Sequence, residues 1–144
     1  MKSLTRWLFL FAGVVFLQLS AEESFEFRGK HFLGSYLHCD STAICDEEQL
    51  KQIMLKAAEE CGAQVLNHSA HVFPGHGLTM VILLSESHAS IHTYPEHGAC
   101  FVDLFTCGDH CKHDRFHEVL LSYLKPQTIN HKVLIRHHSV EELR

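Results

Sequence analysis

Residues 83–109 read LLSESHASIHTYPEHGACFVDLFTCGD, and this stretch decides the fold. The run Ser87–Tyr94 alternates in polarity, which is the period of a half-buried strand, and Ala99–Thr106 is again strand-like. Pro95 and Gly98 interrupt the pattern, and a break of this length is typical of a hairpin. We therefore expect two neighbouring antiparallel strands here.

More strands are predicted on both sides of this pair. Leu78–Leu84 is almost wholly apolar, so we predict a central strand that is covered on both faces. The turn sequence PGHG at 74–77 separates it from a mixed segment at 63–73. Further strand-like patterns occupy residues 31–37 and 129–135.

Two segments have helical periodicity. Asp46 caps the first helix and Gly62 ends it, with a buried stripe of Leu50, Ile53, Met54, Ala57, Ala58 and Cys61. The second helix opens at Asp109 or His113 and closes before Pro126, with a buried side of Phe116, Val119, Leu120, Tyr123 and Leu124. The order β-α-β-β-β-β-α-β predicts an α+β fold, a two-layer sandwich in which the helices pack on one face of an antiparallel sheet.

Composition limits the class of protein. The chain has 144 residues, 46% of them hydrophobic and 20% charged, which suits one folded domain. Its net charge is −5 and no basic run interleaves with aromatic residues, so nucleic acid is not an expected partner. A core of this size is modest, and dimerisation would be a natural way to bury more surface.

The N-terminus has the pattern of a secretory signal peptide at residues 1–21. Lys2 and Arg6 precede an apolar run at 7–19, and the small residues Ser20 and Ala21 follow it. The run is shorter than the roughly 20 residues that a transmembrane helix needs. The alternative is a misassigned start codon, with a product that begins near Phe25. The folded domain is expected at residues 28–144.

Fourteen histidines and six cysteines leave several readings open. A serine and a cysteine near several histidines suggest nucleophilic chemistry, but the G-x-S-x-G motif of hydrolases is absent. Cys107, His110, Cys111 and His113 could form half a zinc site, although no C-x-x-C pair occurs and we expect no metal. A secreted, disulfide-stapled or metal-binding module without catalysis is the alternative from another class.

Several motifs in order resemble one family. They are RGKH at 28–31, AQVLN at 63–67, SESH at 85–88, SIHT at 90–93, PE at 95–96 and DLFTCGD at 103–109. Together they resemble the prokaryotic S-adenosylmethionine decarboxylase proenzymes, over roughly residues 29–124. The sandwich fold of that family agrees with the predicted strand order.

The resemblance implies that the chain cuts itself. In the family, a serine in the place of Ser87 attacks the carbonyl of the preceding residue, here Glu86, and converts the peptide bond to an ester. His92 would then remove the serine α-proton, and Thr79 would assist. The products would be a β chain that ends at residue 86 and an α chain that starts at 87 with a pyruvoyl group.

The resemblance also implies the catalytic roles. A Schiff base to the pyruvoyl group would make it an electron sink for decarboxylation of S-adenosylmethionine, giving the aminopropyl donor for spermidine. Cys107 would protonate the resulting carbanion. Phe73 and His92 would stack on the adenine and Glu96 would hold the ribose. Tyr94 stands where the family often has tryptophan.

Partners, substrate and location follow less directly. The family pattern is an oligomer of two α and two β chains. The same pyruvoyl chemistry could act on another amino acid, ornithine or arginine, and Phe73 and Glu96 favour the nucleoside. The family is cytoplasmic, whereas residues 1–21 indicate export. Export would expose Cys107 to a disulfide with Cys100 or Cys111.

Overall fold

A computed structural model describes residues 27–138 of the chain. The predicted signal segment at 1–21 lies outside the described residues. Within them, no helix has both the length and the hydrophobicity that a membrane crossing requires.

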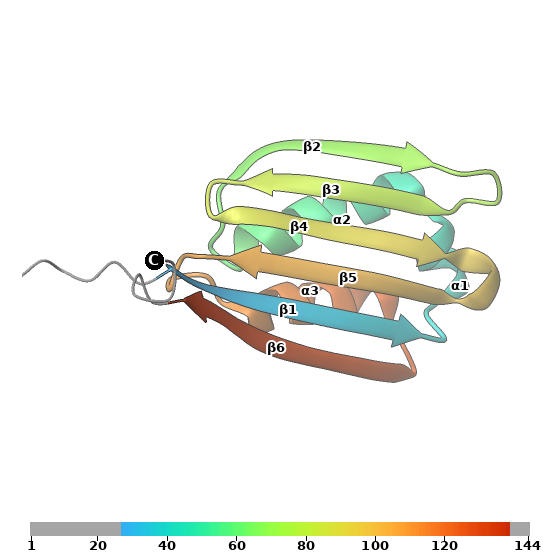
Figure 1. Cartoon of the computed structure of the whole chain (residues 1–144). Coiled ribbons are helices and arrows are strands. Elements are labelled where there is room, and N and C mark those ends of the chain that lie inside the picture. Colours follow the sequence, from blue (N-terminus) through green and yellow to red (C-terminus); the bar gives the residue numbers. More distant parts are fainter. Residues whose placement is uncertain (1–26, 139–144) are drawn as a thin grey trace, which may run out of the picture.

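Six strands form one antiparallel sheet. They are β1 (Phe27–Leu37), β2 (Val65–Val72), β3 (Leu78–Leu84), β4 (Ser87–Tyr94), β5 (Ala99–Thr106) and β6 (Thr128–His138). The spatial order is β2-β3-β4-β5-β1-β6, so the hairpin-linked strands β2 to β5 are consecutive and β1 lies between β5 and β6 (Figure 1). The hairpin predicted between residues 87 and 106 is present, and Ser87 lies opposite Thr106.

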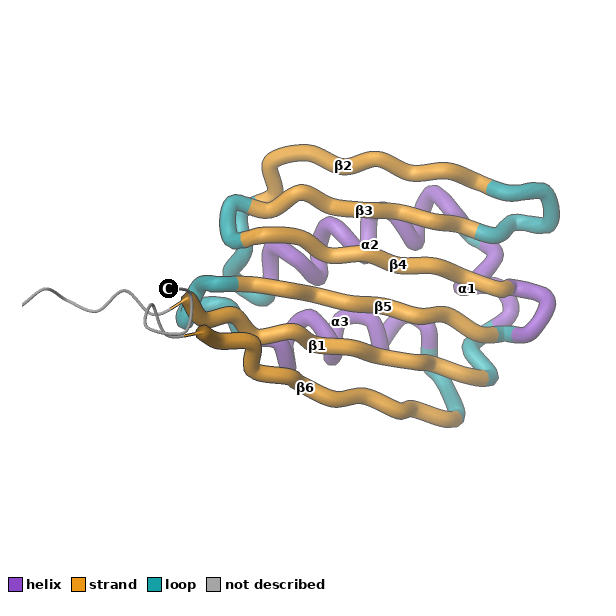
Figure 2. Tube along the Cα trace, viewed as in Figure 1, coloured by secondary structure: helices purple, strands orange, loops and turns teal. Residues whose placement is uncertain are grey.

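The helices all lie on one side of this sheet. They are α1 (Ser41–Cys45), α2 (Glu47–Glu60) and α3 (His113–Leu124), and a short 3-10 turn, η1 (Pro95–His97), joins β4 to β5 (Figure 2). The predicted α+β two-layer sandwich is therefore confirmed. The second helix begins at His113, the later of the two predicted starts.

Local signals explain where the helices begin and end. The Asp46 side chain accepts a hydrogen bond from the Gln49 N–H at 3.0 Å, which caps α2, and Gly62 follows its end with φ +97°. Helix α1 was not predicted, because a single turn is too short to have a periodic apolar stripe. Its capping residue, Asp40, accepts from the N–H groups of residues 42 and 43.

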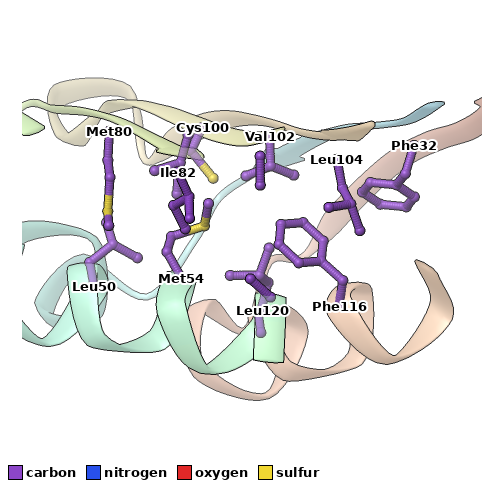
Figure 3. Close-up of a cluster of buried hydrophobic side chains, with 14 of the residues drawn as sticks. Phe32, Leu50, Met54, Met80, Ile82, Cys100, Val102, Leu104, Phe116 and Leu120 are labelled. Atoms are coloured by element: carbon purple, nitrogen blue, oxygen red, sulfur yellow. The ribbon is translucent and has the colours of Figure 1, made fainter. Parts of the chain in front are cut away.

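The core lies between α2, α3 and the inner face of the sheet (Figure 3). Met54 and Leu50 of α2 pack under Met80 and Ile82 of β3, and Phe116 of α3 packs beside the ring of Phe32, in β1, at 6.1 Å between centroids. The predicted helix stripes are thus core residues, and Ile53, Val119 and Tyr123 lie at its edge.

The prediction that β3 is covered on both faces is wrong. Leu78, Met80, Ile82 and Leu84 are buried, but Val81 and Leu83 are 47% and 53% exposed. The strand lies inside the sheet, and its apolar run suggested that both of its faces are covered. Helices cover only one side, so alternate apolar residues remain accessible.

We call the surface away from the helices the open face. On the central strands it comprises every second residue: Thr79, Val81 and Leu83 of β3, His88, Ser90, His92 and Tyr94 of β4, and Phe101, Asp103 and Phe105 of β5. This face combines exposed apolar side chains with histidines, which is the mixture that a binding surface requires.

Candidate active site

The predicted cleavage point lies at the start of β4. Ser85 and Glu86 form the two-residue turn between β3 and β4, since Leu84 and Ser87 are directly paired. The φ angle of Ser87 is +151°, a region that only glycine adopts without strain. Such strain costs about 1–3 kcal/mol, which is worth roughly one to two powers of ten in rate if the reaction releases it.

The end of β5 contacts the carbonyl group of Glu86, which self-cleavage would convert to an ester. The backbone N–H of Cys107 donates a hydrogen bond to the carbonyl oxygen of Glu86 at 3.1 Å. The Glu86 carboxylate is only 11% exposed, accepts from the Gln64 N–H at 3.0 Å, and lies 3.4 Å from Nε2 of His110. These contacts hold the turn and orient the Glu86 carbonyl toward β5.

Gly108 makes this close approach possible. A Cβ at this position would lie 2.6 Å from the His110 ring and 3.2 Å from Cγ of Glu86. A larger residue would therefore displace the His110 ring from its place beside the Glu86 carboxylate. This contact is a physical reason for a glycine immediately after the cysteine.

Cys107 itself is exposed, unlike a thiol that only fills the core. It borders a cavity of 220 Å³ that is lined by Arg28, Gly29, Lys30, Thr106, Cys107, Gly108 and Asp109. Beneath this loop, the buried His113 lies 3.3 Å from Thr106 Oγ1, and burial lowers the pKa of its imidazole. The sulfur is therefore accessible on a loop that is anchored to the core.

A second cluster lies at the opposite end of β4. Thr79 Oγ1 and His92 Nδ1 are 2.5 Å apart, and the His92 ring meets the rings of Tyr94 and Phe73 edge to face at 4.5 and 6.1 Å between centroids. Glu96 follows in η1 with its carboxylate exposed. The structure brings Thr79, Phe73, His92 and Tyr94 together, and Glu96 follows two residues after Tyr94.

The two clusters are separate within one chain. Ser87 and His92 are five residue steps apart along an extended strand, which at about 3.3 Å per step is roughly 16 Å. A histidine at this distance cannot take a proton from the serine of its own chain. The predicted site is therefore divided between the two ends of β4.

Sequence reasoning missed a third group, which lies beside Ser87. His88 Nδ1 is 3.2 Å from Ser87 Oγ, and His88 Nε2 is 3.8 Å from Asp103 Oδ1. Asp103 also accepts a hydrogen bond from Ser90 and lies 3.6 Å from His31 Nε2. An aspartate alone among the apolar residues of β5 was the signal in the sequence.

No group of three or more histidine, cysteine or acidic residues in the described part of the chain is arranged to hold a metal ion. Of the four residues considered for half a zinc site, Cys107 is exposed and His113 is buried.

The fold is a six-stranded antiparallel sheet with helices on one face, and a serine, a cysteine and histidines lie on or beside the other face. This fold and this set of residues define the enzyme class that the sequence motifs indicated. The family model for S-adenosylmethionine decarboxylase matches residues 30–137. The chain belongs to this family.

Curated relatives and a solved structure agree with this assignment. A proenzyme named S-adenosylmethionine decarboxylase from Brevibacillus brevis is 47% identical over 108 residues, which cover 75% of this chain and 81% of that protein. A proenzyme of the same name from Thermosipho africanus is 39% identical over 116 residues, covering 81% and 83%. The crystal structure of the adenosylmethionine decarboxylase from Aquifex aeolicus has a TM-score of 0.68 at 34% identity, covering 74% of this chain and 88% of that one.

Proposed function

We propose that this protein decarboxylates S-adenosylmethionine with a pyruvoyl group that it makes by cutting its own chain between Glu86 and Ser87. The observation that carries the proposal is the contact between the β3–β4 turn and the end of β5. There, a strained serine follows a carbonyl group that is held by the backbone of Cys107. The product would be the aminopropyl donor for spermidine synthesis.

The geometry favours the first step of self-cleavage. When Ser87 Oγ attacks the Glu86 carbonyl carbon, negative charge develops on the carbonyl oxygen. The Cys107 N–H already donates to that oxygen at 3.1 Å, so it acts as an oxyanion donor without rearrangement. Cleavage of the C–N bond also frees Ser87 from its strained φ angle.

The residues around position 87 fit a pyruvoyl group. Ser87 is only half-buried, and the exposed Cys107 lies at the neighbouring strand end, since Ser87 pairs with Thr106. A pyruvoyl group supplies an electron sink for the carbanion that loss of CO₂ leaves. Cys107 would deliver a proton to the substrate carbon, and Lys30 and Arg28 in the same cavity would attract the substrate carboxylate.

The aromatic cluster is suited to a nucleoside. Phe73, His92 and Tyr94 present ring surfaces on the open face, and Phe73 is 42% exposed, so its ring is free to stack on a base. The exposed Glu96 carboxylate can accept hydrogen bonds from a ribose diol. These features favour S-adenosylmethionine over ornithine or arginine.

The separation of the two clusters supports an oligomer in which two copies meet through their open faces. With the strands of the copies running in opposite directions, the His92 end of one copy would reach the Ser87 end of the other. Exposed apolar side chains on the face, among them Val81, Leu83 and Phe101, would then be buried. Each complete site would contain residues of both copies.

Self-cleavage is tested on the purified protein. Wild type should run as two chains on a reducing denaturing gel, and the α chain should resist Edman sequencing because a keto group replaces its amine. Ser87→Ala should remain whole. Wild type that stays whole after long incubation would contradict the proposal.

Cys107 should matter for turnover rather than for cutting. Cys107→Ala keeps its backbone N–H, so the chain should still be cleaved, but loss of the proton donor should slow turnover about 10²–10⁴-fold. The measurement is ¹⁴CO₂ release from carboxyl-labelled S-adenosylmethionine, with Cys45→Ala as a matched control. Wild-type turnover by Cys107→Ala would remove its role as donor.

Sharing of the site between copies is tested by coexpression of two defective chains with different tags. His92→Ala alone should stall, and Ser87→Ala alone should remain whole. In mixed dimers, the intact His92 of the Ser87→Ala chain should serve Ser87 of the other chain, so the His92→Ala chain should be cleaved. If it stays stalled in the mixture, then His92 does not act between copies.

A further inference from the structure

We infer that His88, held by Asp103, is the base that activates Ser87 for self-cleavage. This inference rests on the proposed function and assigns a residue to a step that the function leaves without one. His92 is expected to remove the α-proton, which happens only after the ester has formed. The earlier step, attack by the Ser87 hydroxyl, requires loss of the hydroxyl proton.

The contacts around His88 suit that role. Its Nδ1 atom is 3.2 Å from Ser87 Oγ, and in the same chain His92 is roughly 16 Å away along the strand. Neighbouring residues of a strand normally point to opposite faces, and the unusual φ angle of Ser87 accompanies this contact. His88 is also partly exposed, so its imidazole can exchange protons with solvent.

Asp103 lies where it can orient the imidazole. Its Oδ1 atom is 3.8 Å from His88 Nε2, an ion-pair distance, and Ser90 donates a hydrogen bond to its other oxygen. A carboxylate on this side favours the tautomer with the proton on Nε2, which leaves Nδ1 free to accept from Ser87. The Nε2 atom of His31 is 3.6 Å from the same oxygen of Asp103. This nitrogen is buried and has no hydrogen-bond partner among the described residues.

The step balances without a co-reactant. His88 Nδ1 takes the hydroxyl proton as Ser87 Oγ bonds to the Glu86 carbonyl carbon, and the Cys107 N–H stabilises the oxyanion. The C–N bond then breaks, and the proton on His88 passes to the departing amine of residue 87. The peptide bond has become an ester, and His88 is neutral again.

The test separates His88 from His92 by the stage at which each variant stops. His88→Ala should be cleaved about 10²–10⁴-fold more slowly than wild type, and the remaining chain should resist hydroxylamine because no ester is present. His92→Ala should accumulate an ester that hydroxylamine cuts at Ser87. Added imidazole should partly restore cleavage of His88→Ala, and the exposed His68→Ala is the matched control.

The outcomes distinguish the possible failures. Wild-type cleavage of His88→Ala, or a hydroxylamine-sensitive ester in it, would overturn the role of His88 while leaving self-cleavage intact. Wild type that never cleaves would instead overturn the proposed function. Asp103→Asn should slow cleavage and alter its pH profile, and His88→Gln gives a second variant if His88→Ala does not fold.

Four of the six cysteines are buried in the core, and their positions support a second inference. They lie in two buried pairs: Cys39 with Cys100, 8% and 0% exposed, and Cys61 with Cys111, 1% and 4% exposed. Backbone hydrogen bonds lie close to each pair. The Cys39 N–H donates to the carbonyl of Gly98, two residues before Cys100, at 2.9 Å, and the N–H of Lys112, the residue after Cys111, donates to the Cys61 carbonyl at 2.7 Å. In the first pair, the neighbouring Cys100 side chain lowers the pKa of the Cys39 thiol.

The second bond limits the distance between the two backbones. With standard bond lengths, the Cα atoms of Cys61 and Cys111 are at most about 7.5 Å apart, close to the range that a disulfide spans. We propose that Cys39–Cys100 and Cys61–Cys111 form disulfides in an oxidising compartment. Cys107, which is exposed, and Cys45 would remain free thiols.

In each cysteine pair, the two members lie on either side of the cleavage point at residue 87. Cys39 and Cys61 precede the cleavage point, whereas Cys100 and Cys111 follow it. Each disulfide would therefore join the β chain to the α chain after self-cleavage. Export would expose Cys107 to disulfide formation with Cys100 or Cys111. In the proposed arrangement, both of these thiols are already bonded to other cysteines, so Cys107 would stay free.

Each bond forms by exchange with a low-molecular-weight disulfide such as oxidised glutathione. Two thiols lose two protons and two electrons, and oxidised glutathione accepts them to become two thiols. Burial raises the pKa of the Cys61 thiol to about 11, so the folded protein reacts slowly, and oxidation should take place while the chain folds.

The test uses Ser87→Ala, which stays in one piece, refolded with oxidised and reduced glutathione. After unfolding and alkylation without reduction, two thiols should be modified, and peptide mapping should find the two named pairs. Six alkylated thiols, or any disulfide to Cys107, would overturn the inference. In oxidised wild type, the cleaved chains should separate only after reduction. The single variants Cys39→Ser and Cys61→Ser should each retain one link, and the double variant none.

Discussion

Coverage of the sheet by helices on one side only is the constraint on which the rest of the structure depends. Helices α2 and α3 bury one face and leave the other bare, so alternate residues of β3, β4 and β5 are accessible. Strand geometry then fixes what the bare face presents, since Thr79, His92 and Tyr94 must all point the same way. The face covered by helices forms the core, and the open face presents the side chains of the proposed site.

The same pairing of strands positions the reactive end. Because Ser87 lies opposite Thr106, the residue after β5 comes next to the turn before β4, and Cys107 can contact the Glu86 carbonyl. The hydrogen bond to that carbonyl and the contact of His88 with Asp103 are therefore consequences of one register. A shift of the β4–β5 register by a single residue would disrupt both.

Because the proposed site is divided between the two ends of β4, the open face of the sheet would also be the surface where two copies meet. A single strand is too long for its two ends to act on one another, but two facing copies can bring unlike ends together. The four buried cysteines belong to the core on the other side of the sheet, and the proposed disulfides would join segments before the cleavage point to segments after it. A chain that is cut in the middle of its sheet would keep its two parts together by strand pairing and, when oxidised, by these links.

The sequence by itself determined the order of the elements, the caps at Asp46 and Gly62 and the family, because these depend on local periodicity and on residues adjacent in the chain. The ordered motif also led to the prediction that Ser87, His92 and Cys107 are the site residues. The sequence did not determine that one face of β3 is bare, since an apolar run has the same pattern whether one or two layers cover it. Nor could it reveal that His88 and Asp103 meet or that His92 is remote from Ser87, because these relations depend on strand register and on distances that only the folded chain defines.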